Sequence, residues 1–189
     1  MKKVELRKKY KALRNTLSTE DIDKMSLAIA NQALKADIWN HSFYHIFLPV
    51  PALKEVNTEY ILSILSGKDK NIVISKSDTN KINLTHYLLT DNTTLKVNKW
   101  GVPEPTGGII IDPSQLDVVF IPLLVYDIKG NRIGYGKGFY DAFLKNCRED
   151  CLKVGLSFFR PEDEFNAEIH DMRLTHCITV DEIHKFLTL

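Results

Sequence analysis

The chain has 189 residues, a formal net charge of +1 and 44% hydrophobic content, which is enough for the core of one domain spanning residues 1–189. The near-neutral charge excludes the basic excess of typical nucleic-acid binders, and three cysteines without a C-x-x-C pair argue against a disulfide framework or a cysteine-rich zinc site. The charged N-terminus lacks the apolar region of a secretory signal, and the longest apolar run, residues 118–126, is too short to cross a bilayer, so we expect a cytoplasmic protein without a membrane partner.

Two amphipathic helices are predicted before the first strand. Apolar residues recur every three or four positions over residues 2–17. Ser18 followed by Asp21 has the capping-box pattern, and a second apolar stripe continues to about Ala36. The first helix also carries a basic stripe, made of Lys3, Arg7, Lys11 and Arg14. Taken alone, such a stripe favours a solvated face, although it is also compatible with a row of cations that borders a buried site.

Strands and helices then alternate along the chain. The predicted strands are Phe43–Leu48, Asn71–Ser75, Ile82–Leu89, Asp117–Ile121, Val154–Phe158 and Cys177–Val180. Helices are predicted from Asn57 to Gly67 and from Phe139 to Leu144, whereas Asp91–Ser114, rich in Thr, Asn, Gly and Pro, is predicted to be a long irregular connection. This alternation favours an α/β sandwich with a mainly parallel sheet.

The segment Gly130–Asp141, between a buried strand and a helix, has the composition of an anion-binding loop. Its glycines allow close approach of backbone N–H groups to a ligand, and Arg132 and Lys137 supply positive charges. The spacing is neither that of a Walker A loop nor that of the Rossmann fingerprint, and glycine spacing alone fits a flexible turn as well. Asp141, in the first turn of the predicted helix, either complements the helix dipole or binds magnesium beside phosphate.

Other single residues are ambiguous. Glu55 is either an ordinary acid ahead of a helix or a ligand contact, and Trp100 is either core filler or a stacking platform. The six histidines show no H-x-x-x-H spacing, which argues against a catalytic zinc, and no G-x-S-x-G motif is present.

In combination these segments resemble one known family. Gly130–Asp141 is similar to the signature of 5-formyltetrahydrofolate cyclo-ligases, and Lys3–Arg7 resembles the family's N-terminal basic helix. Phe47–Thr58 resembles its folate-binding segment, and the pieces Trp100–Pro105 and His170–Met172 align in order. The resemblance spans almost the whole chain and implies a three-layer α/β/α sandwich.

The resemblance also implies residue roles. It implies ATP binding by Lys3, Arg7, Arg132, Ile133, Gly134, Tyr135, Gly136, Lys137, Gly138, Phe139 and Tyr140, with Arg132 and Tyr140 as catalytic residues. It implies folate binding by Val50, Glu55, Trp100, Tyr135 and Tyr140, and magnesium (Mg²⁺) binding by Asp141 and Asp171. The implied substrates are ATP and 5-formyltetrahydrofolate, and the implied state is a monomer.

The implied reaction is the ATP-dependent cyclisation of 5-formyltetrahydrofolate to 5,10-methenyltetrahydrofolate, with release of ADP and phosphate. Two alternatives share the glycine-rich anion site. One is a sugar-phosphate isomerase or acyl-CoA transferase on a similar layered fold, which consumption of ATP would exclude. The other is a nucleotide or folate sensor that binds ligand without turnover.

Overall fold

The computed structural model describes residues 2–78, 81–99, 101–168 and 171–186. Its α-helices are α1 (Lys3–Thr16), α2 (Thr19–Ala33), α3 (Glu59–Gly67) and α4 (Phe139–Leu144). The main sheet contains β1 (Phe43–His45), β2 (Asn71–Asp78), β3 (Asn83–Leu88), β6 (Val118–Pro122), β9 (Leu152–Leu156), β10 (His176–Ile178) and β11 (Ile183–Lys185). Two small ribbons pair β4 (Leu95–Val97) with β5 (Pro103–Pro105) and β7 (Val125–Tyr126) with β8 (Arg132–Ile133).

The main sheet is largely parallel. Its strand order is β11-β10-β9-β6-β1-β2-β3, and the five strands from β10 to β2 pair in parallel. The edge strands β3 and β11 are antiparallel to their neighbours. The prediction of a mainly parallel sheet is therefore confirmed.

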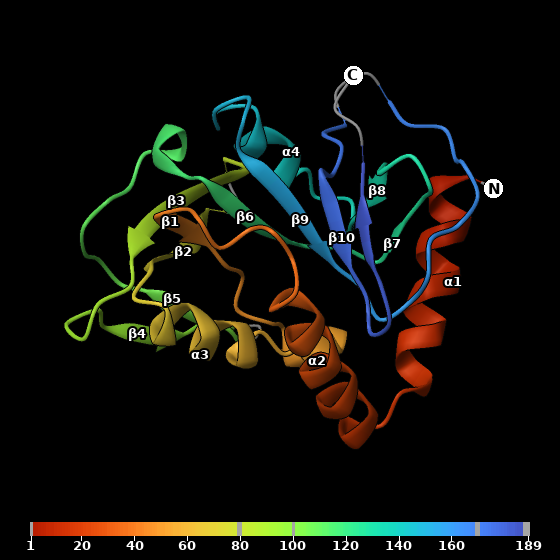
Figure 1. Cartoon of the computed structure of the whole chain (residues 1–189), viewed down its shortest axis with the longest axis horizontal. Helices are drawn as coiled ribbons and strands as arrows, with labels where there is room; N and C mark the ends of the chain where they lie inside the picture. The colour runs from red at the N-terminus through yellow and green to blue at the C-terminus, as the bar shows by residue number, and fades with distance from the viewer. Residues whose placement is uncertain (1, 79–80, 100, 169–170, 187–189) are drawn as a thin grey trace.

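Side chains alternate between the two faces of the sheet and meet a different helix layer on each. Val118 and Phe120 of β6 pack in one apolar cluster with α2 and α3, whereas Val119 and Ile121 pack in a second cluster with Phe143 of α4. Figure 1 shows α2 and α3 below the sheet and α4 above it. Strands covered on both faces read as continuous apolar runs, which explains the run at residues 118–121. The three-layer α/β/α arrangement is thus confirmed.

Helix α1 lies outside these layers, against the β7–β8 ribbon (Figure 1). Its apolar stripe, Leu6 and Tyr10, packs on Leu124, Val125 and Ile133 in a third cluster. The turn between α1 and α2 follows the predicted capping box: Asp21 N donates to Ser18 Oγ at 3.0 Å, and Ser18 N donates to Asp21 at 2.9 Å. Both N-terminal helices are where the sequence predicted them.

Three features differ from the sequence-based predictions. The segment Asp91–Ser114 is not irregular throughout, because it contains the antiparallel β4–β5 ribbon. Strand β2 continues to Asp78, so part of the polar segment 76–81 belongs to a hairpin with β3. Neither the two-residue strands β7 and β8 nor the edge strand β11 was predicted.

Among the described residues, no helix combines the length and the apolar character that a membrane span requires.

Candidate functional site

A cleft of about 720 Å³ lies beyond the ends of β1 and β6, where the chain leaves the parallel sheet. This is where open α/β sheets usually bind ligands. The cleft is bordered by Lys3, Arg7, Val50, Glu55, Arg132, Ile133, Gly134, Tyr135, Gly136, Lys137, Gly138, Phe139, Tyr140, Asp141 and Asp171. The structure thus brings together every predicted site residue that it describes. Trp100, and His170 of the matching C-terminal piece, lie outside the described residues.

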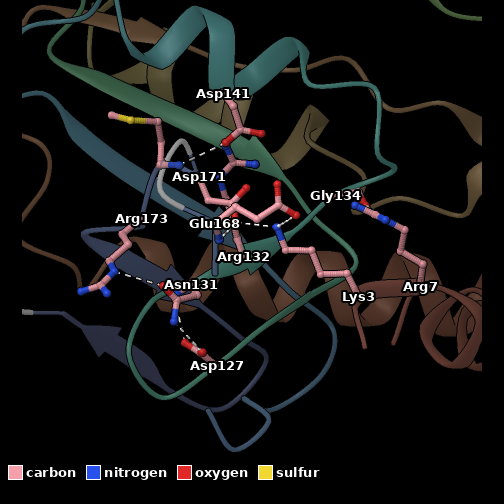
Figure 2. Close-up of polar contacts among 11 residues, drawn as sticks. Lys3, Arg7, Asp127, Asn131, Arg132, Gly134, Asp141, Glu168, Asp171 and Arg173 are labelled. Atoms are coloured by element: carbon pink, nitrogen blue, oxygen red, sulfur yellow. Dashed lines mark hydrogen bonds and ion pairs between the residues drawn. The ribbon is translucent and has the colours of Figure 1, made fainter. Parts of the chain in front are cut away.

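Arg132, on β8, forms the most buried ion pair in the cleft. Its Nη2 lies 2.6 Å from Asp141 Oδ1, and its side chain is 4% exposed whereas that of Asp141 is 26% exposed (Figure 2). Burial lowers the pKa of Arg132, while Asp141, Tyr140 and Asp171 favour its charge. Its Nε is buried without a hydrogen-bond partner among the described residues. The structure therefore holds a desolvated cation that pairs with Asp141, lies within electrostatic range of Asp171 and keeps one N–H donor that no described residue uses.

Lys3 brings a second cation to the same end of the cleft from the start of α1. Its Nζ lies 2.6 Å from Asp171 Oδ2 and 2.9 Å from Glu168 Oε1 (Figure 2). Burial opposes the charge on Lys3, but the hydrogen bonds to these two carboxylates outweigh it and raise its pKa. Asp171 is itself fixed, because Glu168 N donates to its Oδ2 at 2.7 Å.

Arg7, one helical turn after Lys3, holds the glycine-rich loop. Its Nε donates to Gly134 O at 3.0 Å (Figure 2). Gly136 has φ +92°, and a Cβ at this position would lie 3.3 Å from Arg7 Cζ. Gly138, with φ +74°, precedes α4 in the same left-handed region. A side chain at Gly136 or Gly138 would strain the backbone, so glycine is required where this loop turns beside the cation.

A second part of the cleft, beside Val50 and Tyr135, contains a buried carboxylate. Glu55 is 6% exposed and accepts a hydrogen bond from Val50 N at 2.7 Å. Burial raises the pKa of Glu55, and the opposing effects of Val50 N–H, Arg14 and the Tyr135 hydroxyl are smaller. Arg14 Nη1 lies 2.5 Å from the Tyr135 hydroxyl, so Tyr135 bridges Arg14 and Glu55. This part of the cleft can bind a polar heterocycle edge through a carboxylate that is held in place.

A buried polar network supports the β7–β8 ribbon that carries Arg132. The Asp127 carboxylate accepts hydrogen bonds from Lys129 N at 2.9 Å, from Asn131 N at 2.9 Å and from Asn131 Nδ2 at 2.7 Å. Arg173 Nε in turn donates to Asn131 Oδ1 at 3.0 Å (Figure 2). Because Arg173 follows Asp171 closely in sequence, the network ties the turn before Arg132 to the segment that presents Asp171.

The acidic residues of the cleft fit a nucleotide-bound magnesium ion. Asp141 and Asp171 both border the cleft and both act on the charge of Arg132. Among the described residues, both hydrogen bonds of the Asp141 carboxylate use Oδ1, from Arg132 and from Met172 N. In the part of the chain that the structure describes, no group of three or more His, Cys, Asp or Glu side chains is placed to hold a metal. Mg²⁺ commonly binds through one or two carboxylates and substrate phosphates, which this donor set allows.

Sequence reasoning missed two residues of the site. Glu168 pairs with Lys3, and Arg14 is 3% exposed, where it donates to the Tyr135 hydroxyl and to Leu123 O. The sequence did contain a signal for Arg14, because Arg14 continues the basic stripe of α1. Three other members of that stripe, Lys3, Arg7 and Lys11, border the cleft. The sequence contained no comparable signal for Glu168, because its partner Lys3 lies 165 positions away.

Comparisons with known proteins identify the family of the chain. The model of the 5-formyltetrahydrofolate cyclo-ligase family matches residues 1–180. A probable 5-formyltetrahydrofolate cyclo-ligase of Schizosaccharomyces pombe is 25% identical, covering 97% of each chain. The solution structure of the Aquifex aeolicus 5,10-methenyltetrahydrofolate synthetase has a TM-score of 0.83 at 25% identity, covering 100% of this chain and 95% of that one. A Mycoplasma pneumoniae 5,10-methenyltetrahydrofolate synthetase shares the fold, with a TM-score of 0.76 at 21% identity over 96% of this chain and all of that one. The chain belongs to the 5-formyltetrahydrofolate cyclo-ligase family.

Proposed function

We propose that this chain converts 5-formyltetrahydrofolate and ATP into 5,10-methenyltetrahydrofolate, ADP and phosphate. Family membership supports the cyclo-ligase reaction. The observation that carries the ATP-dependent form is the arrangement of the cleft. Arg132, Lys3 and Arg7 border the cleft with two carboxylates among them, and the buried Glu55 borders the same cleft. One cleft thereby offers a polyanion site beside a site for a neutral, polar ring.

The chemistry requires activation of a formamide. The formyl carbonyl is a poor electrophile, and its oxygen is a poor leaving group. In the proposed reaction the formyl oxygen attacks the γ-phosphorus of ATP and ADP leaves, which gives a phosphorylated iminium. The arylamine nitrogen of the same folate then attacks that carbon and loses its proton. Expulsion of phosphate leaves the conjugated methenyl cation, so the protein supplies no covalent nucleophile.

The work of the protein in this scheme is positioning and charge neutralisation. Arg132 and Lys3 would hold phosphate oxygens, and the backbone of the loop 133–139, braced by Arg7, would follow the triphosphate. Asp141 and Asp171 would hold Mg²⁺, which when bound neutralises charge on the phosphates. Removing a preorganised charged donor costs about 3–4 kcal/mol of transition-state stabilisation in comparable sites.

At the folate end, Glu55 and Val50 would orient the pterin. Tyr135 and Tyr140 would lie between the two substrates, because Glu55 acts electrostatically on both hydroxyls and Arg132 acts on that of Tyr140. Burial raises the pKa of both tyrosines, so each remains a neutral hydrogen-bonding group at physiological pH. Trp100 remains an expected neighbour of the folate on family grounds.

The proposal is tested by mixing the purified chain with 5-formyltetrahydrofolate, ATP and Mg²⁺ and following the absorbance of the methenyl product. We expect product only when all three are present and loss of turnover on chelation of the metal. Product formation without ATP would refute the ATP-dependent reaction. Folded protein that binds both ligands without turnover would instead support a sensor.

A further inference from the structure

Two buried histidines and a serine form a hydrogen-bonded chain in the wall of the cleft, apart from every residue assigned above. His45 Nε2 lies 2.7 Å from Ser75 Oγ, and Ser75 Oγ lies 2.9 Å from His86 Nδ1. The three residues come from neighbouring strands β1, β2 and β3, and Ser75 and His86 are a cross-strand pair. Both histidines are buried, whereas Ser75 is half-buried, and His45 and Ser75 border the cleft. Two members of this hydrogen-bonded series, His45 and Ser75, are therefore accessible from the proposed substrate cleft.

The aromatic ring of Phe143 in α4 holds both imidazoles. Its centroid lies 5.1 Å from that of His45 and 4.1 Å from that of His86. The His45 ring also lies 6.0 Å from the ring of Tyr140, one of the two tyrosines proposed to lie between the substrates. Ser75 is thus held on the α4 side of the sheet, and it borders the same cleft as Tyr140.

Both histidines are neutral at physiological pH. Burial lowers the pKa of His45 well below its ordinary value, and the neighbouring His86 adds to this effect. Burial lowers the pKa of His86 to about 4, against the attraction of Asp112. A neutral imidazole has one N–H donor and one acceptor nitrogen, and a serine hydroxyl has one donor and two acceptor lone pairs. The direction of each hydrogen bond can therefore be assigned by counting protons.

The count leaves Ser75 with one unused acceptor position. The backbone of Phe120 favours a proton on the His45 ring. We place that proton on Nδ1, the ring nitrogen that does not contact Ser75 and that is buried without a hydrogen-bond partner among the described residues. His45 Nε2 is then an acceptor, so Ser75 donates to His45 and accepts from His86 Nδ1. The second lone pair of Ser75 Oγ remains for a donor in the cleft.

We propose that Ser75 accepts a hydrogen bond from an N–H group of the reduced pterin, with His45 and His86 as positioning residues that fix the direction of its hydroxyl. A reduced pterin carries several N–H donors on one planar edge, whereas the phosphates of ATP carry none at neutral pH. An unused acceptor flanked by neutral groups therefore suits an N–H group of the pterin and does not suit a phosphate oxygen. The inference rests on the proposed function, because it assigns a contact to that substrate.

Equilibrium binding of 5-formyltetrahydrofolate without ATP tests the proposal directly. Ser75→Ala should weaken this binding about tenfold, the effect of one hydrogen bond left unmade in a closed site, and should leave the KM for ATP unchanged. Ser63→Ala is the matched control, because Ser63 lies on the exposed surface of α3 outside the cleft. Normal folate affinity in folded Ser75→Ala protein, or an equal loss for both substrates, would overturn the proposal.

Variants at His86 separate positioning from packing. His86→Phe keeps a ring against Phe143 but removes the donor to Ser75, so folate affinity should fall several-fold. His86→Asn restores an amide donor near the Nδ1 position and should recover that affinity, even if its melting temperature is lower. Failure of His86→Asn to bind more tightly than His86→Phe would exclude the positioning role. Absence of folate binding by the unmodified chain would instead refute the proposed function itself.

Discussion

The Arg132–Asp141 pair predicts that the two partners differ in their importance for stability. Arg132→Met and Asp141→Asn each remove one charge from an ion pair of 2.6 Å. The residue left behind differs, because the Arg132 side chain is 4% exposed and that of Asp141 is 26% exposed. A charge left unpaired inside the protein is costly, whereas a partly exposed carboxylate can be hydrated. We therefore expect Asp141→Asn to destabilise the chain more than Arg132→Met does.

The burial of each partner sets how much stability each variant is expected to lose. Asp141→Asn leaves a buried guanidinium with an orphaned Nε, and breaking a buried pair in this way costs about 3 kcal/mol, at the low end of the usual range because Asp171 stays near Arg132. The asparagine oxygen can still accept from Met172 N, so the comparison isolates the charge. Arg132→Met fills the space with apolar atoms and should cost about 1 kcal/mol or less. These values correspond to melting-point losses of about 6–12 °C and about 2–4 °C.

Thermal unfolding of the two variants and of the double variant, followed by circular dichroism, measures the difference. The double variant should be more stable than Asp141→Asn alone, because the lone buried cation is gone. Turnover should fall by about 10²–10³ in Arg132→Met, although this is the single variant that is expected to lose less stability. Equal or greater destabilisation by Arg132→Met would refute the assignment of Arg132 as the desolvated partner.

Three further outcomes are expected from the cleft. Lys3→Met should raise the KM for ATP about tenfold and leave that for folate unchanged, and the reverse pattern in steady-state kinetics would remove Lys3 from the phosphate site. Gly136→Ala should weaken ATP binding several-fold by straining a residue at φ +92° against Arg7, whereas Gly107→Ala, with nothing within 4 Å, should not. Glu55 has a raised pKa, so the stability that it contributes is present below its unfolded value near 4.5 and is lost as pH rises through its folded value. Glu55→Gln should therefore lose less stability than the unmodified chain as pH rises above 4.5, while folate binding weakens. Chemical denaturation at several pH values measures this, and equal losses of stability in the two proteins would contradict the prediction.

Local signals in the sequence were sufficient for much of the fold. The capping box at Ser18 and Asp21 predicted the start of α2, because both partners of the hydrogen bonds lie within one helical turn. The apolar run at residues 118–121 predicted a strand covered on both faces, which β6 is. In each case the physical cause acts between residues that are close in sequence.

Elements that depend on distant partners were not predictable in this way. The β4–β5 ribbon is exposed or half-buried at every position except Pro105, and its strands have no apolar period to detect. The strands β7 and β8 have two residues each and exist because they pair with each other. Contacts such as Lys3 with Glu168 and Arg14 with Tyr135 join positions more than 100 residues apart, and neither residue of either pair signals the other.

The packing of α1 explains how such distant groups meet in one site. Leu6 and Tyr10 are one helical turn apart and bury against the β7–β8 ribbon, and Lys3 and Arg7 are one turn apart on the adjacent stripe. Once the apolar stripe is docked, the rotation of the helix is fixed, so the basic stripe must face the cleft. The same ribbon carries Arg132 at its other surface. The cations of the candidate phosphate site therefore hold their spacing through one small apolar cluster rather than through contacts with each other, which like charges would oppose.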